Sequence, residues 1–130
     1  MLNANSTSEL EAPFDGLKIA DISGTVATGY ACKLFADYGA DVLNVEPRQG
    51  FPTRKLAPLL PAQSDQPQNS AMHGFLHCNK SSIICDEADL ASDDRLRQAD
   101  LIVYDPHTLK DTSFLEDRAV NTCAISWFGL

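Results

Sequence analysis

The stretch FDGLKIADISGTVATGYACKLFADYGADVLNVE, residues 14–46, decides the fold. Its apolar run at 17–22 is bounded by turn-forming residues, which predicts a strand buried on both faces. The residues that follow carry apolar side chains on one face of a predicted α-helix, and Gly39 ends that pattern. The members of this apolar face are Val26, Tyr30, Leu34 and Tyr38. Residues 41–45 then alternate into a second strand, so the stretch predicts two parallel strands joined by a helix.

The rest of the chain continues the alternation of strands and helices. Further strands are expected at 82–85, 101–104 and 122–126, and further helices at 89–99, capped by Ser92, and at 113–119. We therefore predict an α/β fold that is Rossmann-like, with a mostly parallel sheet of about five strands and flanking helices.

Length and composition bound the class of protein. The chain has 130 residues, of which 44% are hydrophobic and 22% are charged, as is usual for a single globular domain. The net charge of -8 argues against a nucleic-acid partner, since phosphate binding needs clustered lysine and arginine. Residues 1–11 are polar and lack the order of a secretory signal or a membrane span. We therefore expect a flexible tail over residues 1–13, no membrane partner and a cytoplasmic protein.

A dinucleotide site is the first hypothesis to test in such a fold. Its fingerprint requires G-x-G-x-x-G after the first strand, whereas Gly24 and Gly29 lie five positions apart with no close pair. Glu46 ends the second strand, where a ribose-binding acid would lie, although an acid at a strand end is more often a solvated loop residue.

A long loop rich in proline and glutamine, residues 50–68, follows the second strand. Loops of this length in small domains are usually functional or disordered. Arg48 lies just beyond a strand's carboxyl end, where open α/β sheets bind ligands, and could contact phosphate. Arg54 and Lys55 are equally compatible with phosphate contact and with solvated loop charges.

Histidines and cysteines offer further candidates. His73 and His77 have the spacing of two metal ligands on a helix, but no third ligand follows at a suitable interval, so no metal site is expected. Cys78 beside His77 could be a nucleophile with its base, although neighbours in sequence rarely meet in this way. We expect all four cysteines to be reduced and structural.

Five segments, taken in order, resemble the N-terminal part of the class III CoA-transferases. They are DGLKIADIS at 15–23, LFADYGADVLNVEP at 34–47, NKSSI at 79–83, ADLIV at 99–103 and ISWFG at 125–129. That family includes formyl-CoA transferase, carnitine CoA-transferase and α-methylacyl-CoA racemase. No single motif is decisive, but the order of the five is specific.

The resemblance implies that residues 14–130 form a Rossmann-like CoA-binding half-domain. Its ligand would be coenzyme A or an acyl-CoA thioester, acting as a substrate rather than as a covalently bound cofactor. Carried over position by position, the family's CoA-contacting segments map onto Val26, Ala27, Pro47, Arg48, Asn79, Lys80 and Asp105. The chain departs from the usual family pattern at Thr28-Gly29, Phe51, Ser81 and Asp105-Pro106.

The family's catalytic aspartate lies beyond the segment that ends in Ser-x-Phe-Gly, so the resemblance implies no catalytic residue within this chain. Two hypotheses follow: the CoA-binding part of a transferase that moves CoA between carboxylic acids, or a degenerate module that packs against a catalytic partner or a second domain. A nucleotide-binding domain of another family is a weaker third. We expect a homo-oligomer, or packing against the remainder of a longer protein.

Overall fold

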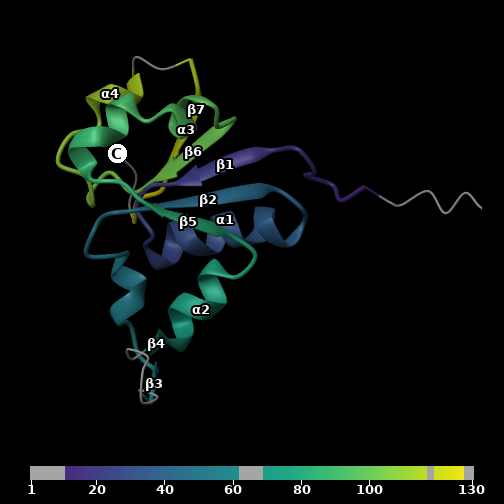
Figure 1. Ribbon diagram of the computed structural model, residues 1–130, viewed down its shortest axis with the longest axis vertical. Coiled ribbons are helices and arrows are strands. Elements are labelled where there is room, and N and C mark those ends of the chain that lie inside the picture. The colour runs from purple at the N-terminus through teal and green to yellow at the C-terminus, as the bar shows by residue number, and fades with distance from the viewer. Residues whose placement is uncertain (1–10, 62–68, 117–118, 128–130) are drawn as a thin grey trace, which may run out of the picture.

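The computed structural model describes residues 11–61, 69–116 and 119–127. Five parallel strands form one sheet in the order β5-β2-β1-β6-β7 (Figure 1). The strands are β1 (Lys18–Asp21), β2 (Asp41–Glu46), β5 (Ser81–Ile84), β6 (Leu101–Tyr104) and β7 (Asn121–Ala124). Because β1 pairs with β2 on one side and β6 on the other, the strand order reverses at β1. The predicted Rossmann-like α/β fold is confirmed.

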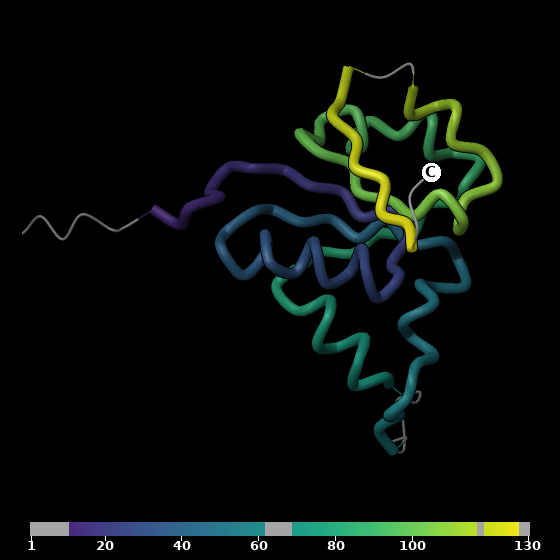
Figure 2. The backbone as a smooth tube through the Cα atoms, turned by 180° about the vertical axis from the view of Figure 1, so that it is seen from behind, coloured from purple at the N-terminus to yellow at the C-terminus, as the bar shows by residue number. Residues whose placement is uncertain are grey.

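Helices cover both faces of the sheet (Figures 1 and 2). On one face lies α1 (Val26–Asp37), against which α2 (Ala71–His77) packs; the other face carries the 3-10 helix η2 (Glu87–Ser92), α3 (Asp94–Arg97) and α4 (Ser113–Glu116). The 3-10 helix η1 (Pro52–Lys55) and the two-stranded pair β3 (Leu59–Leu60) and β4 (Asn69–Ser70) complete the α2 side. The long loop after β2 therefore contains regular structure in its described part.

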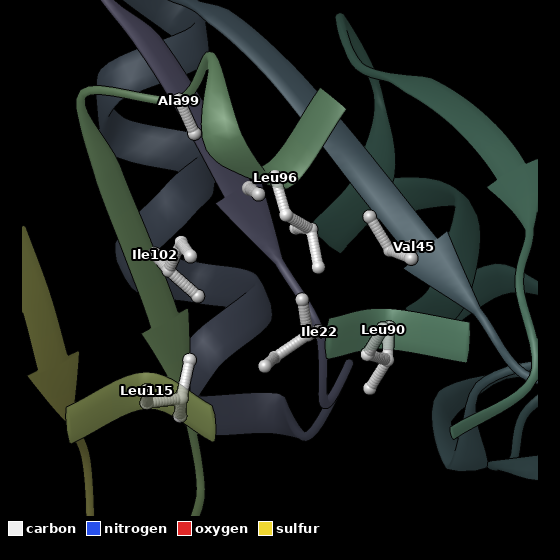
Figure 3. Packing of buried hydrophobic residues seen from close by; sticks show 8 residues of the cluster. Ile22, Val45, Leu90, Leu96, Ala99, Ile102 and Leu115 are labelled. Atoms are coloured by element: carbon white, nitrogen blue, oxygen red, sulfur yellow. The ribbon is translucent and has the colours of Figure 1, made fainter. Parts of the chain in front are cut away.

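The core has two parts, one on each face of the sheet. Alternate residues of a strand point to opposite faces, so Ile19 of β1 packs toward α1 while Ala20 packs toward α3. The cluster on the α3 side is built from aliphatic side chains, as Figure 3 shows. Its buried members are Ala20, Ile22, Val45, Leu90, Leu96, Ala99, Ile102 and Leu115.

The apolar residues whose spacing predicts helix α1 do not pack against the sheet. The exposed fractions are 47% for Val26, 48% for Tyr30, 46% for Leu34 and 57% for Tyr38. The buried face instead carries smaller residues, Thr28, Gly29, Cys32 and Ala36, together with Lys33. Small side chains let the helix lie close to the strands, which leaves the bulky apolar residues outside.

Several element boundaries differ from the sequence prediction. The helix expected at 89–99 is divided into η2 and α3, and Asp93 caps α3 by accepting a hydrogen bond from the N–H of Arg95 at 2.8 Å. Ser92 is wrong as the cap, because Asp93 can place its carboxylate over the first turn. The helix expected at 113–119 is described as α4, and residues 117–118 lie outside the described residues.

The expectation of a flexible N-terminal tail falls mostly on residues 1–10, which lie outside the described residues. Within the described part of the chain, no helix has the length and apolar character needed to cross a bilayer.

Candidate functional site

A pocket of about 420 Å³ opens at the carboxyl edge of the sheet. Its apolar part includes Ile22 after β1, Val45 near the end of β2, and Leu90 of η2. Lys55 and Glu87 add one positive and one negative charge to its lining. In open α/β sheets ligands bind outside the carboxyl ends of strands where the strand order reverses, and this pocket has that position.

The turn after β1 shapes the pocket through a glycine. Gly24 has a positive φ of 58°, and a Cβ atom there would lie 1.9 Å from the Phe51 ring. Glycine is thus required both for the backbone conformation and for the approach of Phe51. Phe51 is buried and lines the pocket, so the loop after β2 closes one side of it.

The buried carboxylate of Asp21 stabilises that turn by hydrogen bonding. Its Oδ1 accepts hydrogen bonds from the N–H groups of Ser23 at 3.0 Å and Gly24 at 2.9 Å. Its Oδ2 is buried and has no hydrogen-bond partner among the described residues. Burial raises the pKa of Asp21, against the opposing effect of the two backbone hydrogen bonds.

Two hydroxyl groups meet at the pocket wall. Thr108 Oγ1 donates to Ser23 Oγ at 2.7 Å, and Ser23 Oγ also accepts from the N–H of Asp105 at 2.9 Å. The Asp105 carboxylate accepts from the N–H of His107 at 2.9 Å and so stabilises the turn after β6. Sequence reasoning missed Ser23 and Thr108, which are 85 positions apart. Ser23 lies two positions after the end of β1, which is a weak signal for a site residue, whereas Thr108 lies four positions after β6 and has no comparable signal.

Glu46 and Arg54 form a tight pair beside the pocket. Arg54 Nε and Nη2 each lie 2.7 Å from a different oxygen of Glu46, which also accepts from Ser82 Oγ and from the N–H of Phe51. Burial alone would raise the pKa of Glu46, but these hydrogen bonds outweigh it and lower the pKa to about 2. Glu46 is therefore occupied in fixing the loop, as is Arg54.

Five of the seven residues expected to contact CoA lie at the carboxyl edge. Pro47 lines the pocket, Arg48 is exposed 3.7 Å from Asp86, and Asp105 follows β6. Val26 and Ala27 form the first turn of α1. Thr25 caps this helix by accepting from the N–H of Thr28, and the remaining first-turn N–H groups point toward the same edge.

Asn79 and Lys80 lie elsewhere, because they precede β5 and a parallel strand begins at the edge opposite to its end. The side chain of Asn79 donates to Asp37 Oδ1 at 3.0 Å, near the end of α1. Lys80 Nζ donates to the carbonyl of Gly29 at 2.8 Å and lies 3.4 Å from His77 Nδ1. Burial lowers the pKa of Lys80, although the charge of Asp21 opposes that change.

The histidine pair belongs to a chain of hydrogen-bonding side chains. Thr53 Oγ1 lies 2.9 Å from His73 Nδ1 and 3.1 Å from His77 Nε2, and His77 Nδ1 lies 3.3 Å from Asn44 Oδ1. Burial, with smaller contributions from Lys80 and His73, lowers the pKa of His77 to about 3. No group of three metal-ligating side chains occurs in the portion of the chain that the structure describes. Thr53 and Asn44 have no sequence signal that links them to the histidines.

Cys78 does not use His77 as a base. Its sulfur lies 3.1 Å from Lys33 Nζ, whereas the His77 ring contacts Thr53 and Asn44. All four cysteines are free, as expected, although Cys78 and Cys123 are exposed.

Comparison with known proteins places this geometry in context. A crystal structure of a CAIB/BAIF family protein from Brucella suis superposes with a TM-score of 0.73 at 24% identity, covering 92% of this chain and 34% of that one. Crystal structures of Rv3272 from Mycobacterium tuberculosis give TM-scores of 0.62 at 24% identity and 0.63 at 20% identity. These cover 87% and 91% of this chain, and 33% and 34% of those.

This chain therefore spans about a third of the length of these solved structures, and the likeness shows the fold. No curated protein matches the sequence. The family model described as CoA-transferase family III matches residues 14–103, which is more than half of the chain. The chain belongs to CoA-transferase family III.

Proposed function

We propose that this chain is the CoA-binding N-terminal part of a class III CoA-transferase and that a CoA thioester binds in the carboxyl-edge pocket. The observation that carries the proposal is the position of the pocket. It lies where the strand order reverses in a chain of this family, and the loops after β1, β2 and β6 contribute to it or border it. In the intact family the reaction would transfer CoA between carboxylic acids.

The chemistry of the pocket suits the parts of such a ligand. Its apolar lining can receive an aliphatic chain, and the hydroxyls of Ser23 and Thr108 can pair with amide groups. Lys55 supplies a cation in the pocket lining for phosphate oxygens, and Arg48, which stands between the lining residues Pro47 and Gln49, supplies a second cation nearby. The N–H groups of Val26 and Ala27 add the positive end of a twelve-residue helix.

We assign this chain a binding role and no catalytic residue. Transfer through a carboxylate needs an acid free to attack the thioester. Three carboxylates near the pocket accept hydrogen bonds, that of Glu46 from Arg54, that of Asp105 from the His107 N–H and that of Glu87 from the Lys110 N–H. The carboxylate of Asp21 is fully buried, and one of its oxygens accepts from the turn after β1. The nucleophile is therefore proposed to come from outside these residues, while Asn79 and Lys80 remain contacts implied only by the resemblance.

A second candidate function is a non-catalytic module that packs against a partner. The exposed apolar face of α1 favours it, because an outer helix face without charge usually lies against protein. We propose that a second copy, or the remainder of a longer protein, covers this face. The negative charges of Glu87 and Asp105 near the pocket also disfavour a polyanion.

Calorimetric titration with CoA separates the two candidates. Binding that weakens roughly five- to tenfold in both Arg48→Ala and Lys55→Ala supports the first, since each change removes one phosphate contact. Lys18→Ala is the matched control, because it removes the same charge from the start of β1 at the opposite edge. Absence of heat at millimolar CoA, with the chain folded, would favour the packing module instead.

A further inference from the structure

Asp21 ends β1, and the turn that its side chain stabilises forms a wall of the carboxyl-edge pocket. The side chain is fully buried, and Oδ1 accepts hydrogen bonds from the N–H groups of Ser23 and Gly24. Ser23 lines the pocket, and the ring of Phe51, another lining residue, lies against Gly24. The position of this wall therefore depends on Asp21, although Asp21 is not itself a lining residue.

The second oxygen of Asp21 is available to hold a proton. Oδ2 is buried, and within the described part of the chain it has no hydrogen-bond partner. A proton on Oδ2 leaves Oδ1 free to accept both backbone hydrogen bonds, because a protonated carboxyl group keeps its acceptor capacity on the other oxygen. Asp21 can therefore change its charge while the turn keeps its hydrogen bonds.

The side chains around Asp21 leave its charge only partly compensated. They come from α1, from the neighbouring strands and from the residue before β5, and are Thr28, Cys32, Asn44, Val103 and Lys80. Burial raises the pKa of Cys32, which stays a neutral thiol, so Lys80 is the cation of this group. On α2, His77 Nδ1 lies 3.4 Å from Lys80 Nζ.

The balance of these effects favours the neutral form of Asp21. Burial raises the pKa of Asp21, and this effect outweighs the backbone hydrogen bonds, the charge of Lys80 and the Thr28 hydroxyl, all of which lower it. A negative charge brought into the adjacent pocket adds to the cost of the ionised form. Protonation of Asp21 and binding of an anion in the pocket therefore favour each other.

We propose that Asp21 is a positioning residue of the carboxyl-edge pocket, and that an anionic ligand binds there together with a proton that Oδ2 takes up. This inference rests on the proposed CoA function, because the phosphates of CoA supply the negative charge. The step is an acid–base equilibrium in which the Asp21 carboxylate and one proton from solvent form the carboxylic acid. No bond of the ligand is broken.

The test is calorimetric titration of the full chain with CoA, between about pH 9 and pH 5, in two buffers that differ in ionisation enthalpy. The comparison of buffers gives the number of protons taken up on binding. The unchanged chain should take up more protons than Asp21→Asn, in which only CoA and the other side chains titrate. Asp41→Asn, at the opposite edge of the sheet, is the matched control and should behave as the unchanged chain.

The affinities give a second readout. Asp21→Asn keeps an oxygen acceptor for the turn but removes the charge, so at about pH 9 it should bind CoA roughly three to five times more tightly than the unchanged chain. The difference should disappear toward about pH 5, where Asp21 of the unchanged chain is also neutral. Asp21→Ala leaves the N–H groups of Ser23 and Gly24 without this acceptor and should weaken binding at least roughly fivefold at every pH.

Two results would overturn this inference alone. One is CoA binding with equal proton uptake in the unchanged chain and Asp21→Asn. The other is a ratio of their affinities that stays the same at every pH, which would mean that the charge of Asp21 is not linked to the pocket. Absence of CoA binding at every pH, with the chain folded, would overturn the proposed function and this inference together.

Discussion

The two faces of the sheet are built from different kinds of residue. Along β1 and its extension, the positions toward α3 and α4 are aliphatic, Ala20 and then Ile22. The positions toward α1 begin with Ile19 and end with the buried carboxylate of Asp21. The α3 face is therefore apolar up to the carboxyl edge, whereas the α1 face becomes polar there.

The same change occurs along β2. Val45 joins the aliphatic cluster on the α3 side, while Val42 on the α1 side is followed by the buried polar residues Asn44 and Glu46. Buried polar groups cost stability unless they are paired, so they add less to folding than aliphatic residues of similar size. The difference teaches that the α3 face mainly stabilises the fold, whereas the α1 face carries most of the buried titratable groups among the described residues.

The largest expected effect lies on the aliphatic face. Leu96 is fully buried in the cluster between α3 and the sheet, so Leu96→Ala should lower the free energy of unfolding by about 2 to 4 kcal/mol. Urea titration measures the change. Leu60→Ala, at an exposed position of β3, is the control, and an equal loss in both variants would contradict the role given to this face.

The next largest effect on stability is expected on the polar α1 face, at Glu46. Arg54→Met leaves this buried carboxylate without its cation and should cost about 2 kcal/mol near neutral pH, a figure reduced because Arg54 is partly exposed. The folded pKa of Glu46 is about 2, below its ordinary value of 4.5, so the stabilisation is present above about pH 4.5 and is lost as the pH falls toward 2.

Unfolding measured along a pH series should therefore show the Arg54→Met variant and the unchanged chain converging in acid. Arg97→Met removes an arginine from an exposed pair with Asp94 and should change stability by no more than about 0.5 kcal/mol. A constant difference at every pH would mean that Arg54 acts through packing alone.

A smaller effect on stability is expected near neutral pH, at His77 on the α1 side of the sheet. The folded pKa of His77 is about 3, below its ordinary value of 6.5, so the unfolded chain binds a proton that the fold excludes. Stability should fall by roughly 1 to 1.5 kcal/mol as the pH decreases from about 7 to 5.5, and His77→Gln should flatten this slope. Exposed His107→Gln is the control, and the idea fails if both variants keep the slope.

The smallest expected effect on stability is on the outer face of α1. Leu34→Glu should change the free energy of unfolding by no more than about 0.5 kcal/mol, because Leu34 is half-exposed, yet it should reduce self-association measured by sedimentation. Gln98→Glu adds the same charge at an exposed site after α3. An unchanged chain that sediments as a monomer at high concentration would contradict self-association through this face.

Sequence reasoning predicted the fold because short apolar runs bounded by turn-forming residues are compatible with few structures other than buried strands. It did not predict which face of α1 packs inward, because Thr28, Cys32 and Ala36 give a weaker hydrophobic signal than Tyr30 or Leu34. Helix packing here is set by size, which a hydrophobic pattern does not report.

Sequence reasoning located only those residues of the candidate site that directly follow a strand, because the end of a parallel strand fixes the edge of the sheet at which they lie. Pro47 and Arg48 follow β2 directly, so the carboxyl edge was accessible to prediction. The pairing of Ser23 with Thr108, and the contact of Thr53 with His77, depend on tertiary contacts between distant segments. No local pattern encodes such contacts.

The most direct test of the central claim is amide chemical-shift mapping of the chain during titration with CoA. We predict that the amides of Ser23, Val26, Ala27 and Asp105 shift together along a single saturable curve, while those of Lys18 and Asp41 at the opposite edge stay unchanged. Shifts confined to the opposite edge, or none at millimolar CoA, would contradict a CoA site in the carboxyl-edge pocket.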